Sequence, residues 1–132
     1  RVPEHDSTPV LENADFCITS WPTKHFIPTI GLRIEVKSSG QVVGYSCDTE
    51  PIPAIVTLSR DVDLLLHEAA GEGFGHSSAA QAGEAAALAG AKRLVLIHYQ
   101  VVNADLEPLI PEARAMFDGP VELAVDHGVY EI

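Results

Sequence analysis

The sequence lacks a long apolar run, because Glu84 and the pair Lys92 and Arg93 interrupt its longest hydrophobic stretches. A membrane-spanning helix needs about 20 consecutive apolar residues, so no transmembrane segment is expected. Cysteine is also scarce. Cys17 and Cys47 are too few for a disulfide framework, and both lie in apolar, strand-like runs where a buried thiol is the default. These absences favour a reducing, cytoplasmic compartment.

Basic residues are scarce as well. The 8 Lys and Arg face 19 Asp and Glu, which gives a formal net charge of −11. This charge repels phosphate backbones and anionic membranes, so the chain by itself is a poor partner for either. The chain begins without an initiator Met or a leader, which predicts that it is a piece of a longer protein. A hydrophobic content of 46% over 132 residues still supplies enough apolar mass for a single domain.

Apolar patterns predict strands first, and then strands that alternate with helices. Residues 1–13 are polar and without a period, so we expect a surface loop there. The expected strands cover residues 14–21, 30–37, 41–47, 62–66 and 94–97, with a terminal hairpin over 121–125 and 129–132. The expected helices cover residues 52–59, 79–89 and 107–117. Ser78 and Gln81 form a capping box for the second helix, and Gly90 ends it. This order predicts an α/β fold, in which helices cover at least one face of a sheet.

Side chains that bind metals or move protons follow the ends of successive expected strands. They are His25, Asp48, the pair His67 and Glu68, and His98. In layered α/β folds, ligands gather at the carboxyl ends of strands, because rigid strands hold side chains there while the loops stay open. A single histidine at a strand end is more often a structural residue, and Asp48 could simply begin a turn. Four such strand ends in succession favour a functional site.

Two short motifs flank the glycine-rich loop at residues 69–75. They are His67-Glu68-Ala69-Ala70 before it and His76-Ser77-Ser78-Ala79 after it. Both resemble the paired His-Glu-Ala-Thr and His-Ser-Thr motifs of ribonuclease Z, in the metallo-β-lactamase superfamily. Three further segments are similar to that family in the same order, at residues 25–35, 45–51 and 94–99. The resemblance runs from about residue 14 to the end of the chain.

The resemblance implies a metallo-β-lactamase-type αβ/βα sandwich, of which residues 1–132 are the C-terminal half, a single domain with a mixed sheet and covering helices. It implies a metal-dependent hydrolase, a ribonuclease Z-like phosphodiesterase, in which two divalent ions, Zn or Mn, activate a water. His25 and His98 would each bind one ion, and Asp48 would bridge both. Glu68 and His76 would form the catalytic pair, in which His76 gives a proton to the departing oxygen.

The sequence also departs from the family. The signature His-x-His-x-Asp-His is absent, so each ion would have two ligands from this chain, whereas a catalytic zinc has three or more. Ligands outside this segment should therefore complete the site. The turn at Ser38-Ser39-Gly40 stands where long family members carry an arm for transfer RNA, which together with the acidic charge disfavours a tRNA substrate. Cys47 replaces a family glycine, and we expect an inert packed thiol there, with a thiol ligand as the alternative.

Two other functions stay open. The missing arm favours a small-molecule phosphodiesterase or esterase of the same superfamily. The half-site and the acidic composition are also compatible with a non-catalytic binding or regulatory module. We expect His67 to be structural or to lie behind the metal ligands without binding an ion. We also expect no membrane partner, and a homodimer as one use of the small-residue surface of helix 79–89. Metal content separates the enzymes from the binding module.

Overall fold

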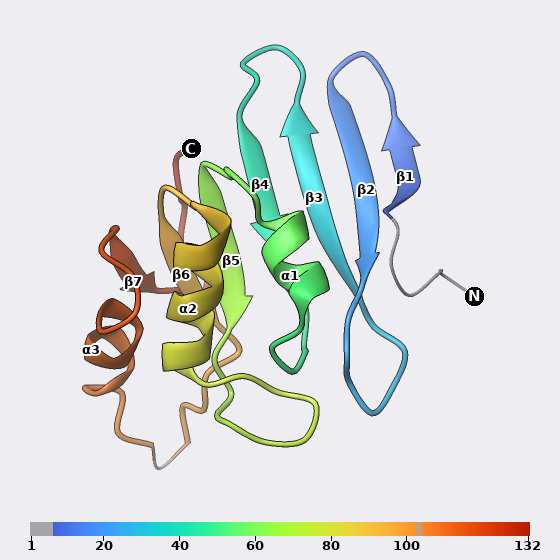
Figure 1. The fold of residues 1–132 in the computed structure, drawn as a ribbon. Helices are drawn as coiled ribbons and strands as arrows, with labels where there is room; N and C mark the ends of the chain where they lie inside the picture. The colour runs from blue at the N-terminus through green and yellow to red at the C-terminus, as the bar shows by residue number, and fades with distance from the viewer. Residues whose placement is uncertain (1–6, 103) are drawn as a thin grey trace.

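The computed structural model describes residues 7–102 and 104–132, which form one seven-stranded sheet and three helices (Figure 1). The strands follow one another across the sheet in chain order. Their bounds are β1 Thr8–Glu12, β2 Phe16–Pro22, β3 Ile30–Val36, β4 Val42–Tyr45, β5 Leu64–Glu68, β6 Leu94–Ile97 and β7 Val121–Leu123. The helices are α1 Pro53–Leu58, α2 Ala79–Ala89 and α3 Leu109–Arg114. The mixed sheet with covering helices confirms the expected α/β architecture.

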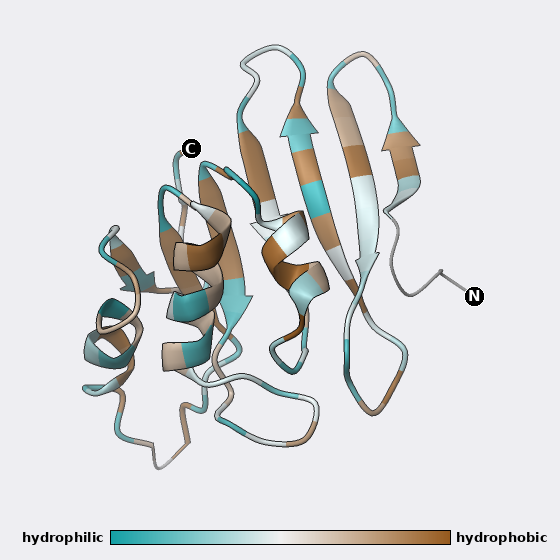
Figure 2. Cartoon of the chain, in the orientation of Figure 1, coloured by the Kyte–Doolittle hydropathy of each residue, from teal (hydrophilic) through white to brown (hydrophobic). Residues whose placement is uncertain are grey.

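The sheet is antiparallel from β1 to β4 and parallel from β4 to β7. Each parallel pair is joined through one helix, because a parallel connection must cross back over the sheet. As a result β2, β4, β5 and β6 all end at the lower edge of Figure 1. In Figure 2, β5 is brown along its length and turns teal at this end. The topology therefore gathers the polar residues that follow these strands.

The helices lie close to the sheet and to one another because glycines leave room for them. A Cβ on Gly31 of β3 would lie 2.6 Å from a methyl of Leu58 in α1. On α2, a Cβ at Gly83 would clash with the Ala113 carbonyl of α3. α2 has the expected capping box and ends at Gly90, which has a φ of 68°. Its buried alanines face the strands, so small residues set the close approach of helix and sheet.

The opposite face of the antiparallel part of the sheet is apolar and is not covered by a described helix. Gly31 faces α1, so its neighbours Leu32 and Ile34 in the same strand point away from the helices. Ile18 of β2 and Val43 of β4 both pair with Ile34 and share that face. All four side chains that face away are half-buried. The antiparallel part of the sheet thus has a second surface that no described helix covers.

The expected surface loop over residues 1–13 was wrong for residues 8–12, and residues 1–6 lie outside the described chain. Residues 8–12 form β1, which pairs antiparallel with β2. The Asn13 side chain accepts hydrogen bonds from the backbone N–H groups of Asp15 and Phe16 and so forms the connecting turn. Pro9 is tolerated because β1 is an edge strand, and the register shifts between Pro9 and Leu11.

The expected terminal hairpin was also wrong. β7 covers only Val121–Leu123, and it pairs parallel with β6. Residues 129–132 form no strand and are held by hydrogen bonds that involve side chains. The Glu131 carbonyl accepts a hydrogen bond from Arg93 at 2.9 Å, and the Tyr130 hydroxyl accepts one from the Val125 N–H at 2.9 Å. Side-chain partners therefore replace the ladder that the apolar alternation predicted.

Other expected elements exist with shifted ends. β5 begins and ends two residues later than expected, so that His67 and Glu68 belong to the strand. α3 is shorter than the expected helix over 107–117. The expectation of buried thiols was wrong, since both cysteines are free and partly exposed. Cys17 pairs with the polar residues Glu12 and Glu35, and Cys47 follows the end of β4. Within the described chain, no helix is both long and apolar enough to cross a membrane.

Candidate metal centre

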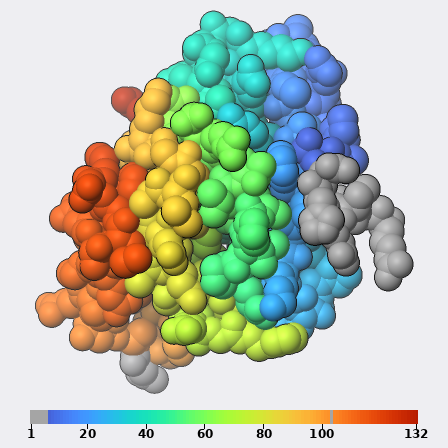
Figure 3. Space-filling view, in the orientation of Figure 1, coloured from blue at the N-terminus to red at the C-terminus, as the bar shows by residue number. Residues whose placement is uncertain are grey.

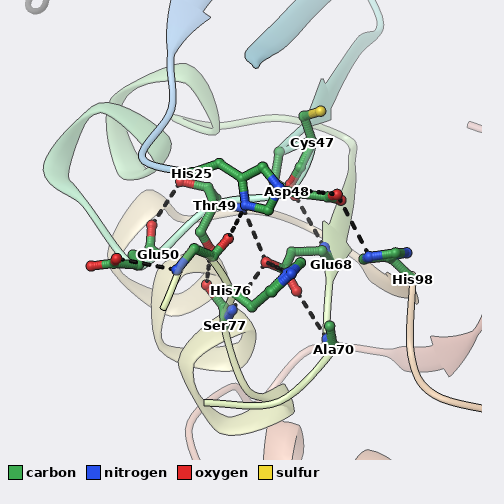
Figure 4. A network of polar contacts seen from close by, with 12 residues as sticks. His25, Cys47, Asp48, Thr49, Glu50, Glu68, Ala70, His76, Ser77 and His98 are labelled. Carbon is green, nitrogen blue, oxygen red and sulfur yellow. Dashed lines mark hydrogen bonds and ion pairs between the residues drawn. The ribbon is translucent and has the colours of Figure 1, made fainter. Parts of the chain in front are cut away.

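Four side chains from four different connections meet at the lower edge of the sheet (Figure 4). His25 follows β2, Asp48 follows β4, His76 lies between β5 and α2, and His98 follows β6 directly. One ligand atom each from Asp48, His76 and His98 lies within 4.8 Å of the other two. The structure thus brings together residues that are far apart in the sequence, as the strand-end pattern predicted for His25, Asp48 and His98 and as the family resemblance implied for His76.

The distances around Asp48 suit a shared metal ion. Its Oδ2 lies 3.6 Å from His98 Nε2 and 3.9 Å from His25 Nε2. Two ligand atoms that are each about 2.0–2.2 Å from one ion are roughly 3–4 Å apart. Imidazole nitrogens with a carboxylate oxygen are the donor set that zinc and manganese accept. These three residues therefore fit divalent ions, with Asp48 as the shared partner of both histidines.

His25 is prepared to bind through Nε2. Its side chain is only 3% exposed, and Nδ1 donates a hydrogen bond to the Gly75 carbonyl at 2.8 Å. A carbonyl can only accept, so Nδ1 carries the ring proton and Nε2 keeps its lone pair. Metal-binding histidines in proteins have this arrangement, in which the second nitrogen is held by a carbonyl or a carboxylate.

Glu68 is fully buried and is held by backbone N–H groups from three segments. Oε1 accepts hydrogen bonds from Thr49 and Ser77, each at 3.0 Å, and Oε2 accepts one from Ala70 at 2.9 Å. A buried carboxyl group without such partners would be costly. The sequence alone predicted Glu68 as a site residue, but not this backbone cradle.

His76 is oriented by Glu68. The distance from His76 Nδ1 to Glu68 Oε1 is 3.1 Å, and Oε1 acts as the acceptor. The other ring nitrogen, Nε2, is then free to face a substrate or an ion. The expected pair of Glu68 and His76 is thus in contact, and His76 also lies in the cluster with Asp48 and His98. Its role as proton donor or as ligand stays a prediction.

Two neighbours of Asp48 are partly buried and contribute to the surroundings of the site. Cys47 has a φ of 55°, where glycine would be free of strain. Burial raises the pKa of the Tyr45 phenol above its usual range, and Cys47 and Asp48 raise it further. Tyr45 is therefore a neutral phenol at physiological pH. Cys47 is absent from the ligand cluster found among the described residues.

A polar clamp holds the loop that carries His76. Glu50 Oε1 accepts a hydrogen bond from the Gly75 N–H at 3.1 Å, and Glu50 forms an ion pair with Lys24. The hydrogen bond from Lys24, followed by the one from Gly75, holds the pKa of the Glu50 carboxyl below its usual range. Lys24 precedes His25, so the clamp ties the His25 loop to the His76 loop.

His67 lies in the interior of the fold, away from the ligand cluster. The side chain is buried, and its Nδ1 donates a hydrogen bond to the Glu68 carbonyl at 2.8 Å. Burial lowers the pKa of His67 below its usual value. By strand alternation His67 and Glu68 point to opposite faces of β5, so only Glu68 reaches the site.

Sequence reasoning missed the residues that act through their backbone. Gly75 has a φ of +81°, and a Cβ there would lie 2.5 Å from His25 Nδ1. Thr49 and Ser77 contribute through their N–H groups, so their side-chain types gave no signal. Glu50 and Lys24 were missed as well, although they act through their side chains. Their opposite charges beside the predicted ligands are a signal that could have identified them.

Comparison with known proteins agrees with this arrangement. The family model described as "Beta-lactamase superfamily domain" matches residues 1–99 of the chain. The ribonuclease Z of Kineococcus radiotolerans is 43% identical over 90 residues, which cover 62% of this chain and 29% of that protein. The ribonuclease Z of Myxococcus xanthus is 38% identical over 103 residues, which cover 70% of this chain and 33% of that protein.

Two solved structures share the fold. The metallo-beta-lactamase fold protein YhfI from Bacillus subtilis has a TM-score of 0.80 at 29% identity, covering 89% of this chain and 48% of that chain. The short form of human tRNase Z has a TM-score of 0.72 at 26% identity, covering 96% of this chain and 47% of that chain. The chain spans about a third of the length of the curated relatives and about half of the solved chains. These likenesses confirm the expected fold class and the resemblance to ribonuclease Z.

Proposed function

Since the chain belongs to the beta-lactamase superfamily, we propose that the protein containing it is a metal-dependent hydrolase that cleaves phosphodiester bonds. The observation that carries this proposal is the cluster of Asp48, His76 and His98, with His25 beside it, at the carboxyl edge of the sheet. The relatives named ribonuclease Z support the choice of a phosphodiester as the bond that is cleaved.

In this proposal His25, Asp48 and His98 would hold the two divalent ions, with Asp48 as a ligand that both histidines approach. The support is that both histidine nitrogens approach the same oxygen of Asp48, at 3.9 and 3.6 Å. When bound, the ions would polarise the phosphoryl group and make water a stronger nucleophile at neutral pH. The chain's own contribution is to fix the ligands in place, and the Gly75 carbonyl does this for His25.

His76 donates a proton to the departing oxygen in the same proposal. Its support is the contact with Glu68, which leaves Nε2 as the nitrogen that can face a substrate. Because backbone N–H groups hold Glu68, the His76 ring is oriented before a substrate arrives, and a positioned donor is the more effective one. The competing role of His76 is that of a further metal ligand, since it belongs to the same cluster.

We infer that the rest of the ligand set comes from another part of the same protein. Two or three ligands per ion from this chain leave a coordination sphere incomplete. The apolar face formed by Ile18, Leu32, Ile34 and Val43 offers a surface on which a second sheet would pack. We therefore propose that residues 1–132 are the C-terminal half of a two-sheet sandwich.

RNA is the first substrate to test, because the curated relatives are ribonucleases. Four of the basic side chains of the described residues are engaged, since Lys24, Lys37, Lys92 and Arg93 each pair with a carboxylate. The strands β3 and β4 are joined by a short turn, as expected, and no arm protrudes there. We therefore propose that contacts to a polyanionic substrate come from surfaces outside this chain, while this chain supplies half of the reaction site.

The test uses the full-length protein with its metal. His98→Ala should lower the metal content and, with it, hydrolysis of every diester. His76→Ala should leave the metal content unchanged and slow a diester with a poor leaving group by about 10² to 10⁴-fold. A p-nitrophenyl diester has a leaving group that needs little protonation, so it should hide part of the His76→Ala defect.

A pair of aspartates provides the matched control. Asp48→Asn should abolish metal binding, whereas Asp63→Asn should not, because Asp63 precedes β5 at the opposite edge of the sheet. Metal loss in His76→Ala would make His76 a ligand. A full-length protein that binds no divalent metal and cleaves no diester would overturn the proposed function.

A further inference from the structure

Large apolar side chains are exposed beside the candidate metal centre. Phe26 is 62% exposed and Ile27 is 55% exposed in the loop after β2, and Phe74 is 76% exposed in the loop before α2. Figure 3 shows these two loops, residues 22–30 in blue and 69–77 in yellow-green, adjoining at the lower edge of the molecule. Exposed apolar groups that gather at one place mark binding sites more often than groups that are scattered.

Phe26 belongs to the ring cluster of the site. Its ring centroid lies 3.9 Å from that of His25, and 6.4 Å from that of His76 with the planes at 69°. A Cβ on Gly75, the neighbour of Phe74, would lie 3.2 Å from Phe26 Cδ1. The Phe26 ring is therefore packed on one side against His25 and the Gly75 backbone, while most of its surface stays open to solvent.

The position of Phe26 relates it to one side of the scissile bond. In the proposed function His76 faces the departing oxygen, so a group attached to that oxygen lies close to His76. Phe26 lies at the end of the cluster formed by His25 and His76, with its ring centroid 3.9 Å and 6.4 Å from theirs, whereas no ring contact joins it to His98 among the described residues. The group that leaves is therefore the part of the substrate that would contact Phe26.

We propose that Phe26 forms an aromatic subsite that binds a planar ring on the leaving-group side of the scissile bond. The proposal rests on the proposed function, because it takes His76 as the residue that faces the leaving group. A planar ring is the ligand of choice, because aromatic side chains stack on flat π-systems and tolerate different ones. The ring can come from a nucleobase or from an aryl ester, and both have this chemistry.

Electrostatics favours a ring over a second phosphate at this position. The cation nearest in sequence, Lys24, is paired with Glu50, and Glu50 also accepts the Gly75 N–H. Lys24 is the one lysine or arginine in this pair of loops, residues 22–30 and 69–77, so no free lysine or arginine remains there for an anion. The subsite should therefore show little dependence on ionic strength, unlike binding through phosphate contacts.

The test measures binding of non-hydrolysable probes to the metal-loaded full-length protein by calorimetry. Phenylphosphonate should bind about tenfold more tightly than methylphosphonate, with cyclohexylphosphonate in between, because only the planar ring stacks. Phe26→Ala should abolish this preference, and Phe26→Leu should reduce it, since leucine keeps the apolar volume without the ring. Leu88→Ala, which removes an exposed apolar side chain on α2, is the matched control and should change nothing.

Two further probes distinguish the sources of the ring. A preference for uridine monophosphate over ribose 5-phosphate that disappears in Phe26→Ala assigns the subsite to a nucleobase. The same effect with phenylphosphonate alone assigns it to aryl esters. An unchanged preference in Phe26→Ala, with metal content and hydrolysis intact, overturns the subsite and leaves the proposed function standing. Loss of metal in Phe26→Ala also overturns it, because Phe26 would then only support His25. Absence of metal and hydrolysis in the unaltered protein is a failure of the proposed function itself.

Discussion

Gly75→Ala should lower the metal affinity of the protein in addition to its effect on stability. The Gly75 carbonyl accepts the hydrogen bond of His25 Nδ1, and the residue has a φ of +81°. An added methyl group would lie 2.5 Å from His25 Nδ1 and 3.2 Å from Phe26 Cδ1. The substitution therefore displaces the His25 ring while every atom of His25 stays in place in the sequence.

The magnitude follows from two separate effects. A residue with a Cβ in the left-handed region costs about 1–2 kcal/mol of unfolding free energy. The steric contact falls on the His25 ring, a side chain that can rotate away, so we expect the ring to move and its Nδ1 hydrogen bond to be lost. Loss of the group that orients a metal-binding histidine lowers metal affinity by about 10- to 100-fold.

The same loop provides two matched controls. Gly71 has a φ of +117° with nothing within 4 Å of its Cβ position, and Gly73 has open space without a positive φ. Gly71→Ala should show the backbone strain alone, and Gly73→Ala should be neutral or more stable by about 0.4–1 kcal/mol. Urea unfolding of the metal-free protein measures the stability, and competition with a chelator measures the metal affinity.

The comparison of Gly75→Ala with Gly71→Ala decides the outcome. We expect similar losses of stability in both variants and a loss of metal affinity in Gly75→Ala alone. Equal metal affinity in the two variants would show that the contact with Gly75 does not hold His25 in place. The claim that the Gly75 carbonyl orients His25 for metal binding would then be refuted.

Three further changes test other parts of the site. Cys47→Gly should be about 0.5–1 kcal/mol more stable in urea unfolding than Cys47→Ala, because glycine adopts a φ of 55° without strain and alanine does not. Equal stabilities of the two variants would show that the backbone of Cys47 is not strained. Because burial lowers the pKa of His67, the unfolded state binds its proton first, so stability should fall as the pH drops below about 6.5, by at most about 1.4 kcal/mol per pH unit. His67→Asn should remove this part of the slope, and an unchanged slope would assign it to other groups. Glu50→Ala should speed hydrogen exchange of the Gly75 amide by up to about tenfold. Glu50→Gln keeps an acceptor and should change the exchange rate less. Equal effects of both variants would show that the ion pair with Lys24, and not the hydrogen bond to Gly75, holds the loop.

The sequence predicted the side chains of the site because they depend on strand ends. Asp48 and His98 follow strands with strong apolar patterns, and parallel strands bring their carboxyl ends to one edge whatever the loops do. The sequence also predicted α2, since Ser78, Gln81 and Gly90 are local signals for the ends of a helix. In both cases the signal lies within a few residues of the feature it predicts.

The features that were missed depend on contacts between distant segments. β1 is stabilised by pairing with β2, and its sequence, with Pro9, has no strand period of its own. The terminal hairpin failed because Arg93, far along the chain, binds the Glu131 carbonyl in place of a strand partner. The role of Gly75 depends on His25, a residue from another loop. Local patterns contain no information on any of these partners.

Some departures from local rules lie at the edge that binds the proposed metal. Cys47 and His98 have φ angles of 55° and 50°, values at which residues other than glycine persist only if surrounding contacts hold them, and Asp61 and His127, outside the site, have similar values. Beside them, Glu68 places a carboxyl group where no water reaches, and backbone N–H groups from three segments satisfy it. α2, by contrast, follows the rules for capping and small-residue packing throughout. Since the sheet and its helices provide the stability, the strand ends at the site can keep strained backbone and a buried carboxyl group for binding and chemistry.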